Sequence, residues 1–373
     1  MSKQFHLLKV ATVRYDTEEA VQIGFKIPLH LKEKFVFDPG QYLTIKATVN
    51  DEILRRAYSI SSPIQEEVIS VVVKRLTGGK VSNFLNDQIK VGDQFEVMPP
   101  GGHFKLSVDK KHQNNYFFFG AGSGITPLMS MIHSILEKEP LSKCYLLYGN
   151  RNEASTIFNN KLKRLSLVYQ NRLVVEHILS RPLKEKPKGI LGNFFPAVAK
   201  WKGQVGRINS QMIGSFLKQH AEDKTIQGYY ICGPGPMIET TVNALKTLDI
   251  DQSIIHREYF SAPDVDPIKE SKAIKVEKAF PSKVTVNLNG HTHEITIKDD
   301  TNIVQALINQ NIEPPYSCLS GTCSTCMAKI TKGAVDMDVS IGLEDDERAK
   351  GYILTCQSHP TTEEVELTFD IED

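Results

Sequence analysis

The stretch "PPYSCLSGTCSTCMAKI", residues 314–330, contains three of the chain's six cysteines within nine positions, and Cys356 follows thirty residues later. The spacing Cys318-x4-Cys323-x2-Cys326 with a distant fourth cysteine is one of the ligand patterns of [2Fe–2S] clusters. Four thiolates satisfy two irons without a histidine. Small residues between the cysteines let backbone N–H groups turn towards sulfide, which helps to set the reduction potential. The spacing therefore predicts an iron–sulfur site with these four cysteines as metal ligands.

Two other uses of the cysteines are weighed against the cluster. A structural zinc site usually takes two C-x2-C pairs, whereas here one pair is spread and Cys356 stands alone. A disulfide is disfavoured in a chain so poor in cysteine. Before the cysteines, "KVTVNLNGHTHEITIK" predicts a hairpin with an Asn289-Gly290 turn, and a helix follows it. Together these segments resemble the plant-type ferredoxin domain over residues 281–373, which implies an α+β, β-grasp fold.

Composition limits what the whole chain can be. Its 373 residues are 40% hydrophobic, enough for two or three domains with buried cores. Basic and acidic residues balance at 44 each, so nothing argues for a nucleic-acid partner. No apolar run approaches the roughly 20 residues that a membrane helix needs. The N-terminus turns polar too soon for a secretory signal. These features predict a cytoplasmic protein without membrane insertion.

The chain divides into three domains and a linker. Residues 1–108 contain many short β-rich runs separated by Gly and Pro, with a helix near Ser82, and predict an antiparallel β-barrel. Residues 113–260 alternate strands with helices, which is typical of an α/β domain with a parallel sheet. Residues 261–280 are polar, with two prolines and no periodicity, and are the best linker candidate. The ferredoxin-like domain occupies residues 281–373.

A flavin is expected between a nicotinamide and the cluster. A nicotinamide gives up two electrons as hydride and the cluster accepts one, so a cofactor that handles both is required. Two segments of the first domain are candidates for its site, "RRAYSISSP" at 55–63 and "GGKVSNFL" at 78–85. The first alone could be an ordinary strand. The second leads into a helix whose free N–H groups can hold a pyrophosphate.

Together the two segments resemble the ferredoxin–NADP reductase family, in which an R-x-Y-S motif and a later G-x-x-S segment bind FAD. The resemblance implies that Arg56 pairs with the FAD phosphates and Tyr58 packs on the isoalloxazine. It also implies that Ser59 forms a hydrogen bond near flavin N5. The pyrophosphate contacts would come from Gly79, Val81 and Ser82.

The second domain contains matching nucleotide segments. "FFFGAGSGITPLM" is not the G-x-G-x-x-G fingerprint, but it resembles the family's nicotinamide-nucleotide segment, with Gly120, Gly122, Gly124 and Thr126 as binding residues. "YYICGPGPMIE" resembles the family's C-G-P-x-x-M segment, which implies that Cys232 lies beside the nicotinamide with Gly233 and Pro234. In "REYF", Glu258 matches the family's acidic catalytic residue and Phe260 the aromatic that covers the flavin.

The choice between NADPH and NADH depends on the charged residues that follow the predicted strands of the second domain. An arginine marks the 2′-phosphate of NADP and a carboxylate the free 2′-OH of NAD. Arg151 in "YGNRNE" and the pair Ser180-Arg181 favour NADPH, whereas Glu153 keeps NADH open.

The order flavin, nucleotide, ferredoxin resembles the reductase components of bacterial oxygenases. The strings "ILRRAYSI", "YGNR" and "ICGP" are most similar to the group that serves phenylacetyl-CoA epoxidases. This resemblance implies electron flow from NADPH through FAD and the [2Fe–2S] cluster to a di-iron oxygenase. Two alternatives stay open: a reductase for a fatty-acid desaturase or another hydroxylase, and a non-catalytic interaction module that binds zinc.

Overall fold

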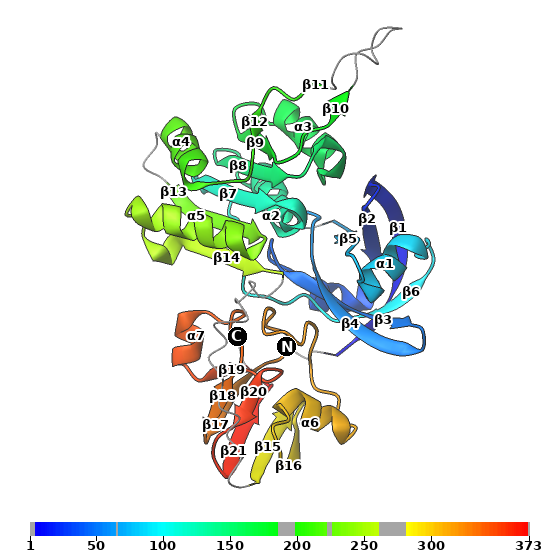
Figure 1. The fold of residues 1–373 in the computed structure, drawn as a ribbon. Helices are drawn as coiled ribbons and strands as arrows, with labels where there is room; N and C mark the ends of the chain where they lie inside the picture. Colours follow the sequence, from blue (N-terminus) through cyan, green and yellow to red (C-terminus); the bar gives the residue numbers. More distant parts are fainter. Residues whose placement is uncertain (1–3, 65, 186–197, 222–225, 261–280, 372–373) are drawn as a thin grey trace.

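The computed structural model describes residues 4–64, 66–185, 198–221, 226–260 and 281–371. Three successive sheets, each with its own hydrophobic core, make up these residues (Figure 1). The predicted linker, 261–280, lies outside the described residues. Among the described helices, none is long and apolar enough to cross a bilayer.

The first domain is a six-stranded antiparallel sheet in the order β4-β3-β6-β1-β2-β5. Its two edges meet through a bridge between Ile60 and Val71, which closes the sheet and confirms the predicted barrel. Alternating β-branched residues of β2 and β5 fill its interior. The elements are β1 (His6–Thr17), β2 (Ala20–Lys26), η1 (Leu29–Phe35), β3 (Tyr42–Val49), β4 (Glu52–Ser59), β5 (Val68–Lys74), α1 (Lys80–Asp87) and β6 (Gln94–Val97).

The second domain is a six-stranded parallel sheet in the order β12-β9-β8-β7-β13-β14, as predicted. Its elements are β7 (Asn115–Ala121), η2 (Gly122–Gly124), α2 (Ile125–Lys138), β8 (Lys143–Asn150), η3 (Glu153–Ser155), α3 (Asn159–Val168), β9 (Leu173–Leu179), β12 (Gln204–Val205), α4 (Ser210–His220), β13 (Ile226–Gly233), α5 (Gly235–Thr247), η5 (Gln252–Ile254) and β14 (Ile255–Tyr259). A small separate ribbon pairs β10 (Lys184–Glu185) with β11 (Val198–Ala199).

The run "YFFF" in β7 follows from burial on both faces. Tyr116 and Phe118 pack into a core with α2, while Phe117 and Phe119 pack into the opposite core with α4 and α5. Parallel strands covered by helices on both sides lose the polar alternation of a half-exposed strand.

The strand order of this sheet reverses between β7 and β13, and ligands of open α/β sheets bind at such a switch point. There the turn after β7 touches the end of β13. A Cβ on Gly124 would lie 2.0 Å from the carbonyl oxygen of Cys232, so only glycine permits this approach.

The third domain is a mixed five-stranded sheet in the order β16-β15-β21-β17-β19, with α6 contributing to its core, which confirms the β-grasp expectation. Its hairpin turns at Asn289 and Gly290, which both have positive φ, +52° and +76°, as the Asn-Gly signal predicts. The elements are β15 (Ser282–Leu288), β16 (His291–Ile297), α6 (Ile303–Asn309), β17 (Met327–Lys332), β18 (Val335–Met337), α7 (Asp345–Ala349), β19 (Tyr352–Leu354), β20 (Ser358–Pro360) and β21 (Glu364–Thr368).

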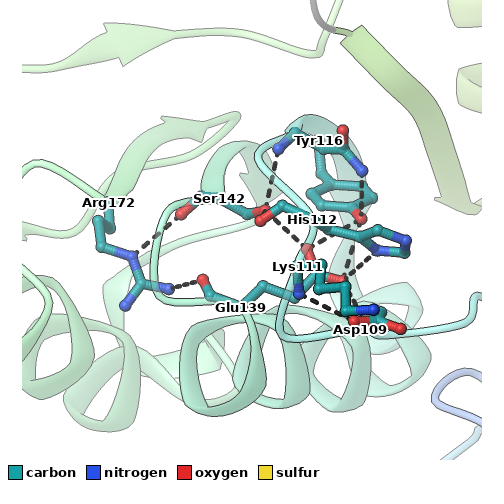
Figure 2. Close-up of polar contacts among 8 residues, drawn as sticks. Asp109, Lys111, His112, Tyr116, Glu139, Ser142 and Arg172 are labelled. Carbon is teal, nitrogen blue, oxygen red and sulfur yellow. Dashed lines mark hydrogen bonds and ion pairs between the residues drawn. The ribbon is translucent and has the colours of Figure 1, made fainter.

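A buried carboxylate joins the connector between the first two domains to the end of α2. Figure 2 shows Glu139, which is fully buried, surrounded by donors. Its carboxylate accepts hydrogen bonds from the hydroxyls of Ser142 (2.7 Å) and Tyr116 (3.0 Å) and from the Asp109 amide (3.2 Å), and it pairs with His112 Nδ1 at 2.9 Å. This network fixes the path of the chain from the barrel into β7.

Candidate functional site

The first two domains meet at two of the predicted catalytic residues. Ser59, at the end of β4, donates a hydrogen bond to Glu258 Oε2 in β14 at 3.4 Å. Cys232 is opposite Glu258 in the parallel register and opposite Gly120 on its other side. The structure therefore places Gly120, Cys232 and Glu258 in one row across β7, β13 and β14, with Ser59 beside them.

Burial controls the charge of this row. Desolvation raises the pKa of the half-buried Glu258 carboxyl to about 8, and the hydrogen bond from Ser59 opposes that rise. Burial, with a smaller contribution from the charge of Glu258, raises the pKa of the Cys232 thiol well above its usual value. Near neutral pH the thiol is uncharged and most of the carboxyl is protonated. Groups that are neutral near pH 7 and shielded from water are suited to a redox site.

The predicted FAD residues lie on β4 and at the start of α1. Arg56 is exposed, and Tyr58 packs partly against the barrel core. The Ser82 hydroxyl is engaged locally, since it accepts a hydrogen bond from the Leu76 amide (3.3 Å). Val81 is a core side chain. Any contact of this segment with a pyrophosphate therefore falls to the backbone N–H groups that begin α1.

The two Gly-containing nucleotide segments lie at the switch point, at the ends of β7 and β13. Thr126 donates its hydroxyl to the Ser123 carbonyl (3.0 Å) and so stabilises the turn through Gly122 and Gly124. Pro234 is the N-cap of α5, directly after Gly233. Phe260 follows β14 and is 43% exposed.

The predicted NADP-selecting residues lie side by side where β8 and β9 end. The amide of Arg181 donates to the carbonyl of Arg151 (2.7 Å), and that of Ser180 to the carbonyl of Asn150 (2.9 Å). Both arginine side chains are exposed, and within the described residues neither has an ion-pair partner. The Asn150 side-chain Nδ2 is buried without a partner in the described part of the chain. Sequence reasoning missed Asn150, because a polar residue at a strand end has many uses.

The four cysteines of the third domain come together. The thiol of Cys318 is within hydrogen-bonding reach of Cys323 and Cys356, and that of Cys356 also reaches Cys326. Pairing of β17 with β19 accounts for the approach of the distant cysteine, because Met327 is opposite Leu354. The 29 residues between Cys326 and Cys356, which include β17, β18, α7 and β19, thus bring the chain back to the other three cysteines.

Hydrogen-bond donors lie near the cysteine sulfurs, as expected if the sulfurs ligate an iron–sulfur cluster and accept hydrogen bonds. The amide of Ser320 points at Cys318 Sγ (3.4 Å), and Gln357 Nε2 lies 3.8 Å from Cys356 Sγ. The Ser317 hydroxyl is buried, with no hydrogen-bond partner among the described residues. Four soft ligands with nearby donors are what an iron–sulfur cluster requires.

The segment with the first three cysteines, residues 318–326, is called the cysteine loop below. It also contacts the first domain, and the sequence did not predict this contact. The Tyr42 hydroxyl lies 2.9 Å from Thr325 Oγ1, and this oxygen is 3.4 Å from Cys323 Sγ. Tyr42 is opposite Ser59 in the register of β3 and β4. The first domain therefore presents neighbouring strand positions to the second domain and to the cysteine loop.

Two further contacts join the first and third domains. Arg55, whose side chain is only 4% exposed, donates to the Pro314 carbonyl (3.1 Å), and its guanidinium lies 4.0 Å from the centre of the Tyr316 ring. His103 Nδ1 lies 3.1 Å from Glu347 Oε1. Nothing in the doublet Arg55-Arg56 distinguishes the buried arginine from the exposed one.

Comparison with known families agrees with this division. A model described as an oxidoreductase FAD-binding domain matches residues 7–106, an oxidoreductase NAD-binding domain matches 118–243, and a 2Fe-2S iron-sulfur cluster binding domain matches 286–361. The last range includes all four clustered cysteines, which argues against the non-catalytic zinc module.

Individual relatives share the whole arrangement. A component of the 1,2-phenylacetyl-CoA epoxidase from Escherichia coli (strain K12) is 36% identical over 98% of both chains. The ferredoxin reductase component of 3-ketosteroid-9-alpha-monooxygenase from Rhodococcus rhodochrous is 31% identical over 97% of this chain and 96% of its own. The structure of phthalate dioxygenase reductase, 23% identical, covers 98% of both chains with a TM-score of 0.56 and shares the fold. The chain therefore belongs to the ferredoxin–NADP reductase family, in the three-domain form of oxidoreductases that have FAD-, NAD- and [2Fe–2S]-binding domains.

Proposed function

We propose that this chain is the cytoplasmic reductase component of an oxygenase of the phenylacetyl-CoA epoxidase type, and that it passes electrons from NADPH through FAD and a [2Fe–2S] cluster to a di-iron partner. The observation that supports it best is that the second and third domains contact two neighbouring strands of the first domain, β4 and β3. Ser59 contacts Glu258 of the nucleotide domain, and Tyr42, its neighbour in the register, contacts the cysteine loop.

The residue roles that we propose come from the family resemblance, and this arrangement supports them. FAD, when bound, accepts two electrons as hydride and releases them singly. Ser59, Cys232 and Glu258 orient the reacting rings, and their neutral side chains limit the water between them. Arg56 and the start of α1 bind the FAD phosphates, while Phe260 covers the ring. Cys318, Cys323, Cys326 and Cys356 ligate the irons.

The preference for NADPH is part of the proposal. Arg151 and Arg181 stand together at the carboxyl edge of the sheet and can form charge-assisted hydrogen bonds with a 2′-phosphate. Glu153, the residue that kept NADH open, accepts a hydrogen bond from the Leu183 amide at 2.9 Å, so part of its capacity for a ribose hydroxyl is already used.

Reconstitution tests the partner. Purified full-length protein with NADPH should support epoxidation of phenylacetyl-CoA by the oxygenase component of that system. Support of a 3-ketosteroid-9-alpha-monooxygenase at a higher rate, with no epoxide formed, would contradict the assignment. A fatty-acid desaturase in a third assay tests the remaining alternative.

Cys323→Ser tests whether electrons reach the oxygenase through the cluster. The variant should lose iron, keep FAD and still reduce ferricyanide with NADPH, but it should not support the oxygenase. Cys144→Ser is the matched control, because Cys144 is a buried cysteine in a strand of the second domain, outside the group of four. Retention of the normal iron content in Cys323→Ser would show that the ligand assignment is wrong.

A further inference from the structure

The contact between Tyr42 and the cysteine loop extends the hydrogen bonds of the cluster site across a domain boundary. Tyr42 and Thr325 are both buried, 6% and 5% exposed, so water does not compete for this bond. The Tyr42 backbone pairs in both directions with Gly101, at 2.9 and 3.1 Å, and Gly102 leaves room for the ring, since a Cβ there would lie 2.9 Å from it. The hydroxyl is therefore held rigidly towards the loop.

Donor counting fixes the direction of the chain of hydrogen bonds when Cys323 is a thiolate ligand. The sulfur is then an acceptor only, so the hydroxyl of Thr325 donates to it. A threonine hydroxyl has one proton, so its oxygen accepts from Tyr42. Aligned hydrogen bonds strengthen one another. Tyr42 therefore reinforces the hydrogen bond that the cluster ligand receives.

The first and third domains have features of a separable pair. Their hydrophobic cores are distinct, and polar contacts join their described residues: Tyr42 with the loop, Arg55 with Pro314, and His103 with Glu347, beside the packing of Arg55 on the Tyr316 ring. Beside Arg55 the two surfaces leave a cavity of about 330 Å³ between residues such as Lys46 and Glu313. Interfaces of this kind between domains commonly open and close.

From these observations we infer that Tyr42 makes the reduction potential of the cluster depend on docking of the third domain, an inference that rests on the proposed function. In the docked arrangement, in which Tyr42 contacts Thr325, the reinforced hydrogen bond stabilises the reduced cluster and raises its potential. With FAD and the cluster bound, docking would favour transfer of one electron from reduced flavin to the cluster, which would oxidise the flavin by one electron and reduce one iron from ferric to ferrous. Undocking would remove the Tyr42 bond, lower the potential and favour release of that electron to the oxygenase.

The test is the midpoint potential of the cluster in the full-length protein, measured by redox titration followed by electron paramagnetic resonance. Tyr42→Phe removes only the hydroxyl and should shift the potential to a more negative value at unchanged iron and FAD content. Arg55→Gln weakens docking without touching Tyr42 and should shift it in the same direction. Matched controls within the first domain are Tyr15→Phe, which loses a bond to the Asn86 carbonyl, and Arg75→Gln, which loses a pair with Asp87. Neither control should change the potential.

Variants of Thr325 test the same two hydrogen bonds, from Tyr42 to Thr325 and from Thr325 to Cys323, by changes in the third domain. Thr325→Val should lower the potential, Thr325→Ser should restore it, and Tyr42→Phe should have no further effect when added to Thr325→Val. An unchanged potential in Tyr42→Phe overturns the inference. A shift in Tyr42→Phe with none in Arg55→Gln overturns the dependence on docking. Protein without FAD or iron would refute the proposed function instead, and the two failures are thus distinct.

Discussion

Two carboxylates of the second domain, Glu139 and Glu258, have opposite surroundings. Glu139 is fully buried and has partners from four residues, including the short bonds from Ser142 and Tyr116 (Figure 2). Within the described residues the Glu258 carboxylate has a single hydrogen bond, a long one of 3.4 Å from Ser59, and its pKa is raised to about 8 by desolvation. A buried carboxylate with many partners holds its surroundings together, whereas one with few partners and a raised pKa is a candidate functional group.

The arginines of the same domain repeat this contrast. Arg172 donates to the carbonyls of Glu139 (2.6 Å) and Ser142 (3.0 Å), as Figure 2 shows. It also donates to the Leu136 carbonyl (3.2 Å) and so joins the loop before β9 to the end of α2. Arg181 is exposed, and in the described part of the chain its side chain has no hydrogen bond or ion pair. Arg172 has a structural role, whereas no partner within the described residues occupies the side-chain donors of Arg181.

Removal of Glu139 is expected to have the largest effect. Glu139→Ala leaves the Tyr116 hydroxyl and the Asp109 amide without the acceptor they have in the structure, and leaves the Ser142 hydroxyl only its longer bond to the His112 carbonyl (3.3 Å). Loss of one partner from a buried charged network should lower the free energy of unfolding by about 3–5 kcal/mol. Calorimetry of thermal unfolding measures this, with hydrogen exchange over residues 109–116 to locate it.

The matched control is Glu137→Ala, two residues away in α2. Glu137 is 37% exposed and pairs with His133 at 3.2 Å on the helix surface. Its loss should cost below about 1 kcal/mol. Equal destabilisation by the two substitutions would contradict the structural role given to the Glu139 network.

Arg181→Ala is expected to have an intermediate effect, on binding and not on folding. Loss of a charge-assisted hydrogen bond to the 2′-phosphate should cost about 1.5–3 kcal/mol, which raises the KM for NADPH by roughly 10- to 150-fold. The KM for NADH and the unfolding temperature should stay near their original values. Steady-state kinetics with both nucleotides provides the measurement.

Arg172→Ala is the counterpart, and it should lower stability with little change in nucleotide preference. A parent enzyme that uses NADH and NADPH equally well would show that the exposed pair Arg151 and Arg181 does not select the nucleotide. Arg172 and Arg181 would then differ in their contribution to stability but not in their contribution to nucleotide selection.

The sequence allowed the three domains, the barrel, the parallel sheet, the Asn289-Gly290 hairpin and the clustering of four cysteines to be predicted. These features depend on local signals: turn residues, periodicity and ligand spacing. Contacts between domains were not predictable in this way. Tyr42 reaches Thr325 across 283 positions of sequence, and the partner of Arg55 depends on how two finished domains pack.

The Glu139 network was missed for a related reason. A glutamate after the polar end of a helix, "ILEKE", is typical of an exposed position. The return of the connector at Asp109 and His112 covers it and adds donors to those of Tyr116 and Ser142. The row Gly120, Cys232 and Glu258, by contrast, was predicted residue by residue through family resemblance, although its registration across three parallel strands needed the structure.

The smallest expected effect, and the one with the opposite sign, comes from Glu258→Gln. The pKa of this carboxyl is raised from 4.5 to about 8 in the folded protein. The folded state therefore binds more protons than the unfolded state between these values, and the stabilisation present below pH 4.5 is lost as the pH rises through 8. Glutamine does not titrate and avoids that loss.

At pH 5 the parent and Glu258→Gln should thus unfold at similar temperatures, whereas at pH 8.5 the variant should be the more stable. A half-buried carboxyl keeps part of its hydration, so the gain should be about 1 kcal/mol, which is less than one pKa unit of linkage. Glu139→Gln should instead lose stability at both pH values, because its amide cannot accept all the bonds that the carboxylate accepts. If Glu258→Gln were also destabilising at pH 8.5, Glu258 would be a structural carboxylate like Glu139. The distinction between a satisfied and an under-satisfied acid in this domain would then fail.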